Sequence, residues 1–294
     1  MNNDARKKAL ILAGGGMKVA FQAGVMQVWQ DEAGLEFDHA DGCSGGVMNL
    51  AMWCQGMSGK QIADNWRKLK PLAGVSINYF QMLFLPFARS VFNMKRFQKN
   101  VFRKAWGLDW DKIRATKKSA GFNVYEFDNH ELHVLPASRM NEDFLTACIA
   151  LPVWFPPVRI EDRTYIDPVY ITDANLEDAI EKGADELWII WTVSEDPEWD
   201  SGFINKYFQV IETSANGRLK RTLERIDRNN AAIESGEHAE FGRRIDYKII
   251  KAEVDLHYLF NFTNKKFRAA VEHGVQAARE WCRENDIPLK EPVS

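Results

Sequence analysis

The 294-residue chain has few cysteines and no long apolar run. Its four cysteines, Cys43, Cys54, Cys148 and Cys282, include neither a Cys-x-x-Cys pair nor a metal-ligand cluster, which argues against a zinc site or a disulfide framework. No apolar run approaches the length of a membrane span, and the apolar stretch behind the polar residues 1–8 is too short for a signal peptide. We therefore expect a cytoplasmic protein with reduced thiols.

The chain also lacks a strong net charge. Its 38 lysines and arginines nearly balance its 41 aspartates and glutamates, and the formal net charge of -3 gives no general attraction for nucleic acid. The hydrophobic content of 46% is enough for a substantial core. Without an internal repeat or a low-complexity tract, the sequence predicts one large α/β domain with an appendage and no nucleic-acid partner.

A serine between glycines carries the strongest chemical signal. Residues 42–46 read Gly-Cys-Ser-Gly-Gly, with a candidate strand at residues 36–41 and an almost wholly apolar candidate helix at residues 47–54. A glycine-flanked serine also occurs in ordinary turns and linkers, but a strand–turn–helix setting exposes the hydroxyl of Ser44 on a sharp turn. This setting favours a nucleophile for acyl transfer.

A second glycine cluster, residues 14–16, follows the apolar residues 8–13 and opens a segment with helical apolar spacing over residues 17–29. The cluster is not a dinucleotide fingerprint, because Val19 occupies the position of the last glycine. It is not a Walker loop either, because no Ser or Thr follows Lys18. Two interpretations remain: a tight turn that needs small residues, or free amides that bind an anion such as the oxyanion of a tetrahedral intermediate.

Three separated motifs occur in a specific order. With Gly-Gly-Gly-Met-Lys at residues 14–18, Gly-Cys-Ser-Gly-Gly at residues 42–46, and residues 147–157 leading to the Tyr-Ile-Asp of residues 165–167, the chain resembles the patatin-like phospholipase family. The resemblance extends over residues 7–195. It implies an α/β fold of three layers with a mainly parallel central sheet.

The resemblance also implies a chemistry. Ser44 would be the nucleophile, Asp167 would accept its proton, and the amides of Gly14, Gly15 and Gly16 would form the oxyanion hole, with no metal or organic cofactor. The implied activity is that of a serine acyl hydrolase acting on lipid-like carboxylic esters, as a phospholipase A, a lysophospholipase or an esterase does. A carboxylate base predicts activity that persists at mildly acidic pH, where a catalytic histidine would be protonated.

The third motif departs from the family pattern. Where the family has Asp-Gly-Gly or Asp-Gly-Ala, this chain has Asp167, Pro168 and Val169. Proline fixes its own φ and drives the preceding residue into extended geometry, so a turn that relied on glycine must be rebuilt. Asp173 is the alternative carboxylate, although its position predicts a cap for the helix that starts near Leu176.

Two other functions stay open at this level. In an α/β-hydrolase with a Ser-Asp-His triad the nucleophile follows several strands, whereas Ser44 has room before it for only two. None of the six histidines shows a carboxylate pairing by spacing, and His39, the nearest in sequence, lies on the strand that enters the turn. The other alternative is a catalytically inactive lipid-binding or scaffold protein, in which Pro168 marks lost catalysis.

The segment 65–108 contains no acidic residue and is rich in aromatic side chains, including residues 79–87 and Phe92, Phe97, Phe102 and Trp106. An amphipathic element of this kind can lie peripherally on an anionic membrane surface. It can equally be a cap whose apolar face covers the catalytic layer. The nine basic residues of the segment are Arg67, Lys68, Lys70, Arg89, Lys95, Arg96, Lys99, Arg103 and Lys104.

The sequence predicts two regions. Residues 1–195 form the patatin-like catalytic domain, with residues 65–108 as a basic, aromatic helical insertion. Residues 196–294 form a mostly helical extension, with a strand at residues 244–254, that completes the fold and shapes the acyl pocket.

Overall fold

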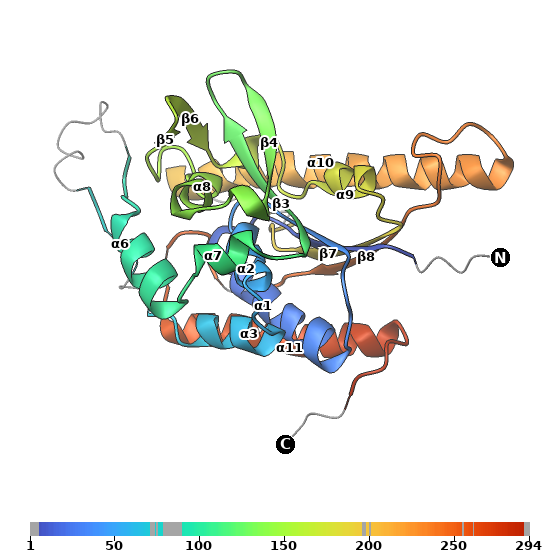
Figure 1. Cartoon of the computed structure of the whole chain (residues 1–294), viewed down its shortest axis with the longest axis horizontal. Helices are drawn as coiled ribbons and strands as arrows, with labels where there is room; N and C mark the ends of the chain where they lie inside the picture. Colours follow the sequence, from blue (N-terminus) through green and yellow to red (C-terminus); the bar gives the residue numbers. More distant parts are fainter. Residues whose placement is uncertain are drawn as a thin grey trace.

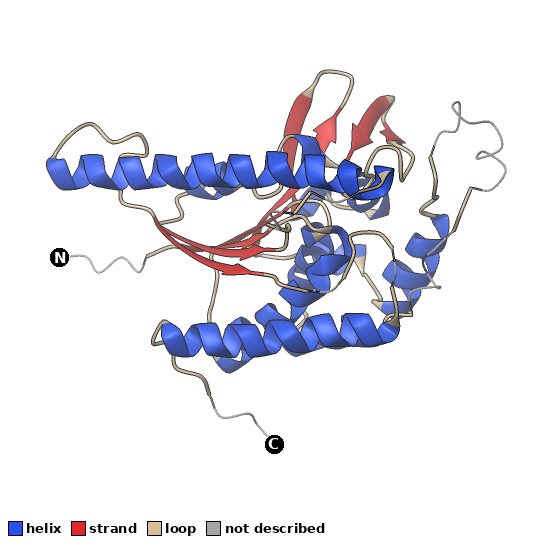
Figure 2. Ribbon diagram, turned by 180° about the vertical axis from the view of Figure 1, so that it is seen from behind, coloured by secondary structure: helices blue, strands red, loops and turns tan. Residues whose placement is uncertain are grey.

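The structure, a computed structural model, describes residues 6–70, 74, 76–78, 90–195, 198–199, 201–254, 256–260 and 262–290. The chain forms three layers, with a central sheet between two layers of helices (Figures 1 and 2). The sheet has eight strands in the order β5-β6-β3-β2-β1-β7-β8, and β4 pairs with β3. The strands are β1 (Lys8–Leu12), β2 (His39–Gly42), β3 (Ser119–Glu126), β4 (Glu131–Pro136), β5 (Val158–Ile160), β6 (Arg163–Ile166), β7 (Glu186–Trp191) and β8 (Asp246–Lys251).

The centre of the sheet is parallel. Strands β3, β2, β1, β7 and β8 run in one direction, and β4, β5 and β6 add antiparallel pairings at one end. In β1, Leu10 and Leu12 join the core on one face of the sheet, while Ala9 and Ile11 join the core on the other. A strand buried on both faces has no polar side, which is why β1 reads as a continuous apolar run. The predicted fold is confirmed.

Helices cover both faces of the sheet. Figure 2 shows α10 running across one face and α11 across the other. The helix α1 follows a turn of 3-10 helix at Gly16–Val19 and continues into π-helical turns at Gln27–Glu32. The helices are α1 (Ala20–Met26), α2 (Gly46–Cys54), α3 (Gly59–Arg67), α6 (Lys95–Phe97), α7 (Trp110–Arg114), α8 (Glu142–Cys148), α9 (Leu176–Glu181), α10 (Phe203–Ser235) and α11 (Asn264–Glu284).

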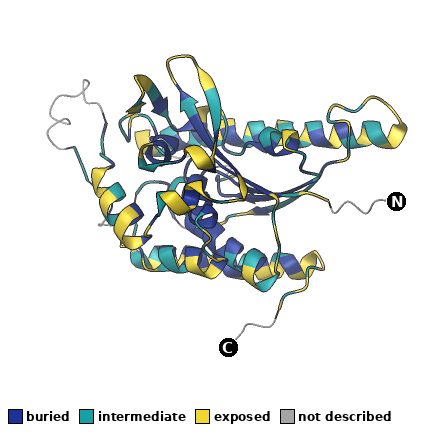
Figure 3. Cartoon of the chain, in the orientation of Figure 1, coloured by how far each residue is buried: buried dark blue, intermediate teal, exposed yellow. Residues whose placement is uncertain are grey.

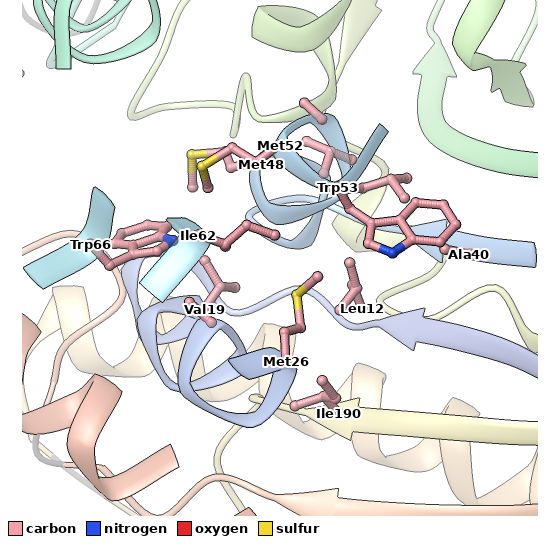
Figure 4. Packing of buried hydrophobic residues seen from close by; sticks show 14 of the residues in the cluster. Leu12, Val19, Met26, Ala40, Met48, Met52, Trp53, Ile62, Trp66 and Ile190 are labelled. Carbon is pink, nitrogen blue, oxygen red and sulfur yellow. The ribbon is translucent and has the colours of Figure 1, made fainter. Parts of the chain in front are cut away.

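The larger core lies between the sheet and the layer of α1, α2, α3 and α11. Figure 4 shows side chains of this core from the sheet (Leu12 and Ile190), from α1 (Met26), and from α2 and α3 (Met52 and Trp66). All five side chains are buried. They hold the first two strand–helix units together, and these units carry both glycine motifs.

The backbones of α1 and α11 approach each other closely. A Cβ atom on Gly24 would lie 2.1 Å from the carbonyl oxygen of Val271, and a Cβ atom on Gly274 would lie 2.2 Å from that of Phe21. Glycine inside a helix costs about 1 kcal/mol relative to alanine, and here the close packing offsets that cost. The helix near the end of the chain is thereby tied to the helix that follows the first glycine loop.

Three local predictions differ from the structure. The strand predicted at residues 244–254 is shorter, since β8 occupies Asp246–Lys251. The strand before Ser44 occupies His39–Gly42 rather than residues 36–41. The cap of α9 is Asn175, whose side chain accepts a hydrogen bond from the backbone N–H of Asp178, so the predicted capping role of Asp173 is wrong.

Residues 196–294 contribute α10, β8 and α11. β8 extends the sheet beside β7, and α11 packs on α1. Before β8, α10 is one continuous helix of 33 residues. The division of the chain at residue 195 stays a prediction.

The basic insertion carries its apolar face inward. Phe102 and Trp106 are buried in the larger core, and the ring of Phe97 packs against both. These contacts favour the interpretation of this part as a cap; residues 79–87 lie outside the described residues. Figure 3 shows the exposed outer side of α6 and the following π-helical turns, which carries Lys95, Arg96, Lys99, Arg103 and Lys104. In the described part of the chain, no helix is both long and apolar enough to span a membrane.

Candidate active site

Ser44 lies in a tight turn between the end of β2 and the start of α2. Its φ of 46° is in the left-handed region, which is strained for serine and directs the side chain away from the strand. The turn fits closely against β1, because a Cβ atom on Gly46 would lie 2.1 Å from the carbonyl oxygen of Leu12. Packing therefore requires glycine at position 46, two residues after the serine, and the predicted strand–turn–helix setting is present.

Asp167 comes from the end of β6, 123 positions further along the chain. The Ser44 hydroxyl donates a hydrogen bond of 2.7 Å to Oδ2 of Asp167. The other carboxylate oxygen, Oδ1, accepts the backbone N–H of Val169 at 3.0 Å. The structure therefore brings together the serine and the aspartate that the sequence singled out.

The proline that breaks the family pattern fits the turn. Pro168 is the first residue of a 3-10 helix, Pro168–Tyr170, and Asp167 is its N-cap. Proline suits the first helical position because the N–H it lacks would have no partner in the helix. Asp167 is extended there, with a ψ of 132°, as a residue before proline prefers. The departure from glycine thus leaves the carboxylate aimed at Ser44.

Burial dominates the electrostatics of this carboxylate. Removal from water raises the pKa of Asp167 from 3.8 to about 8. The hydrogen bonds from Ser44 and Val169 act in the opposite direction, and the negative charge of Asp173 adds to the increase. Asp167 therefore holds a proton more tightly than an exposed aspartate and becomes a stronger base once it is ionised.

The glycine loop after β1 offers two amides rather than three. The N–H of Gly14 donates to the carbonyl oxygen of Asp173 at 2.7 Å, so it is not free for an oxyanion. Gly15 and Gly16 line the cavity that contains Ser44. Both have positive φ, 154° and 52°, and a Cβ atom on Gly16 would lie 2.4 Å from the carbonyl oxygen of Tyr258. Only glycine suits this loop.

An apolar cavity opens beside Ser44 and Asp167. Helices α2 and α10, the loop after α8 and the segment after β8 supply its walls. A small number of polar groups in a mostly apolar pocket is typical of a small-molecule site. Its apolar lining includes Met48, Leu151, Phe155, Val169, Phe208 and Leu259.

A family model described as patatin-like phospholipase matches residues 10–180, which is more than half of the chain. The chain belongs to the patatin-like phospholipase family. Membership supports a hydrolase in general and a lipid as its substrate. The crystal structure of VipD from Legionella pneumophila is similar to this chain, with a TM-score of 0.47 and 16% sequence identity, over 95% of this chain and 67% of VipD. Comparison with curated proteins finds no match.

No histidine hydrogen-bonds to Ser44 in the described part of this patatin-like protein. His39 is buried on β2, where its Nδ1 lies 2.9 Å from Oγ of Ser119. His133 contacts Glu126 through Nε2 at 3.0 Å. These contacts give the two histidines structural partners and offer no support for a Ser-Asp-His triad.

One group of side chains has the composition of a metal site. Among the described residues, His39, Asp41 and Asp178 place their ligand atoms within 4.8 Å of one another. Lys182 already forms an ion pair with Asp178, and burial raises the pKa of Asp41 well above its usual value. His39 also contacts Asp178 through Nε2 at 3.4 Å, so Asp178 already has two partners within the protein, and the expected metal-free chemistry stays a prediction.

Asp173 does not take the place of Asp167. It is buried, and its carboxylate pairs with the guanidinium of Arg218 on α10 at 2.9 Å. Burial raises the pKa of Asp173 to about 7, and Arg218 opposes that increase. Sequence reasoning missed Arg218, because it is one of many basic residues on an amphipathic helix and no motif marks it.

Proposed function

We propose that this protein is a serine acyl hydrolase that cleaves lipid-like carboxylic esters through a dyad of Ser44 and Asp167. The observation that carries the proposal is the 2.7 Å hydrogen bond between the two side chains at the wall of an apolar cavity. A nucleophile and a base within hydrogen-bond reach are the requirement for covalent acyl transfer. The acyl chain would occupy the cavity.

In the proposed reaction, ionised Asp167 accepts the proton of Ser44 while Oγ attacks the ester carbonyl. The amides of Gly15 and Gly16 donate to the oxyanion that forms. Collapse of the tetrahedral intermediate breaks the ester bond, and the leaving alcohol takes the proton from Asp167. Water then attacks the acyl-enzyme with Asp167 as its base; the bond between the acyl carbon and Oγ of Ser44 breaks, Oγ takes the proton from Asp167, and the carboxylic acid is released. No metal or organic cofactor takes part in these steps.

Active-site labelling tests the proposal. A fluorophosphonate probe should label folded wild-type protein covalently, and Ser44→Ala should abolish the labelling, because the probe reacts only with an activated serine. A folded wild type that is neither labelled nor able to hydrolyse a p-nitrophenyl ester would contradict the proposal. It would favour the alternative of a lipid-binding or scaffold protein.

We also propose that the basic insertion attaches the protein peripherally to anionic lipid surfaces from the cytoplasm. The charges support this idea, since exposed cations near an anionic bilayer contribute about 1 kcal/mol each. The apolar contribution cannot come from Phe102 and Trp106, because both are buried in the core. Exposed apolar residues elsewhere, Val153 and Phe203, are 52% and 77% exposed and offer alternative contacts.

Charge reversal at Lys95, Lys99 and Lys104 should weaken binding to liposomes that contain phosphatidylserine. Three lost cations correspond to roughly a hundredfold in partitioning at low salt, while hydrolysis of a soluble ester should be spared. Arg103 is left intact because it pairs with Glu142. Sedimentation at several salt concentrations measures the effect.

The matched control reverses three exposed basic residues on the second half of α10, Lys220, Arg221 and Arg228. Its net charge equals that of the insertion variant, and it should retain binding. Equal losses in the two variants would mean a general charge effect. Wild-type protein that does not sediment with anionic liposomes at low salt would refute the membrane proposal.

A further inference from the structure

Arg218 holds the loop that carries Asp167. From α10 its guanidinium donates to the carbonyl oxygen of Val169 at 2.9 Å and to that of Tyr170 at 2.9 Å. These two carbonyls belong to the 3-10 helix Pro168–Tyr170, whose N-cap is Asp167. The last carbonyls of a helix have no partner within it, so the guanidinium caps this short helix at its C-terminal end.

The same guanidinium reaches the glycine loop through Asp173. It pairs with Oδ2 of Asp173 at 2.9 Å, and the backbone carbonyl of Asp173 accepts the N–H of Gly14 at 2.7 Å. The other carboxylate oxygen of Asp173 lies 3.1 Å from the position of a Cβ atom on Gly14. One side chain is thus connected to both halves of the candidate site.

We propose that Arg218 is a positioning residue that fixes Asp167 against Ser44 and keeps the glycine loop in place beside them. The inference rests on the proposed function, because it assigns a purpose to the alignment of that dyad. Arg218 does not contact Ser44 or Asp167 directly. It acts through the loop that follows Asp167.

The planar fork of arginine is essential to this role. Its nitrogens bind two carbonyl oxygens and one carboxylate together, and its Nη1 also donates to Oγ of Ser214 at 2.9 Å. Lysine carries the same charge on a single nitrogen and cannot reproduce that geometry. If Arg218 aligns the loop, Arg218→Lys should lower kcat. If Arg218 only neutralises Asp173, Arg218→Lys should keep kcat.

The test compares Arg218→Met and Arg218→Lys with wild type, using hydrolysis of p-nitrophenyl butyrate and the rate of fluorophosphonate labelling. Arg218→Met should lower kcat at least tenfold with less than a threefold change in KM, and labelling should slow in parallel. Arg218→Lys should fold with near wild-type Tm and still lose at least fivefold in kcat. Arg225→Met is the matched control, since Arg225 lies on the same helix and pairs with Glu177 and Glu240. It should keep wild-type kcat.

Asp173→Asn separates charge from alignment. It keeps the backbone link to Gly14 but removes a negative charge that raises the pKa of Asp167. The acidic limb of the pH–kcat profile should move to lower pH in this variant, whereas in Arg218→Lys kcat should stay low at every pH.

The inference fails if Arg218→Lys has wild-type kcat, because the fork would then be unnecessary. It also fails if Arg218→Met lowers Tm while kcat per folded molecule is unchanged, which would make the contacts merely structural. Failure of the proposed function is distinct, since wild-type protein would then show neither labelling nor hydrolysis before any arginine variant is made.

Discussion

Ser44→Ala and Asp167→Asn should each lower ester hydrolysis about a thousandfold or more while the protein stays folded. Ser44 supplies the attacking oxygen, and Asp167 is the carboxylate that accepts its hydrogen bond at 2.7 Å. The asparagine keeps the shape and the contact with Val169 but cannot take up a proton. Turnover of a soluble p-nitrophenyl ester measures the loss, and the thermal midpoint confirms folding.

The double variant makes this prediction sharper. Because the two groups act as one unit, Ser44→Ala with Asp167→Asn should be about as inactive as either single variant. Additive losses would mean that the groups act separately. An Asp167→Asn protein that kept more than about a tenth of the activity, a loss of under roughly 1.4 kcal/mol, would refute the dyad. Asp173 would then be the next carboxylate to test.

Activity should fall as the pH drops below about 8. Asp167 must be ionised to accept the proton of Ser44, and burial raises its pKa to about 8. About half of Asp167 is ionised at pH 8 and about a hundredth at pH 6, so kcat/KM should decrease roughly fiftyfold between pH 8 and pH 6. The prediction from sequence, activity persisting at mildly acidic pH, assumed a carboxylate of ordinary pKa, and the raised pKa of buried Asp167 predicts the opposite trend.

The stability of the fold should change in the opposite direction. The folded pKa values of Asp167 and Asp173, about 8 and about 7, lie above their usual value of 3.8. The folded state therefore binds these protons more tightly than the unfolded chain does. Their contribution to stability is fully present below about pH 4 and is lost as the pH rises through 7 to 8. Tm should thus decrease over the range in which activity increases.

Rate profiles and thermal melts between pH 5 and 9 test both trends. In Asp167→Asn the decrease of Tm with pH should be smaller than in wild type, because one titrating group is gone. A flat rate profile between pH 6 and 9 would contradict the assigned base. So would an acidic fall that disappears when His39 or His133 is replaced, since that result would make a histidine the base.

The local parts of the candidate site could be predicted from the sequence. A serine in a glycine turn needs only the strand before it and the helix after it, and Ser44 lies in that setting in the structure. Asp167 was found because its motif is short and contiguous. The burial of β1 could also be predicted from the sequence, since a strand covered on both faces must be apolar throughout.

The sequence did not predict the surroundings of these groups. In sequence, Gly14 cannot be distinguished from Gly15 and Gly16. In the structure its N–H donates to the carbonyl oxygen of Asp173, which is distant along the chain. Nor does helical spacing distinguish Arg218 from other basic residues of α10. Partners so far apart in sequence meet only when the layers pack.

The sequence by itself therefore determined the family, the parallel three-layer fold and the identity of the serine and aspartate, because each depends on local pattern and backbone preference. The tertiary structure alone decided the burial of Asp167, the hydrogen bond that occupies the amide of Gly14 and the inward face of the aromatic insertion. Proton affinity depends on how much water a carboxylate loses, and a free donor depends on which distant acceptor reaches it. Both are properties of the packed molecule.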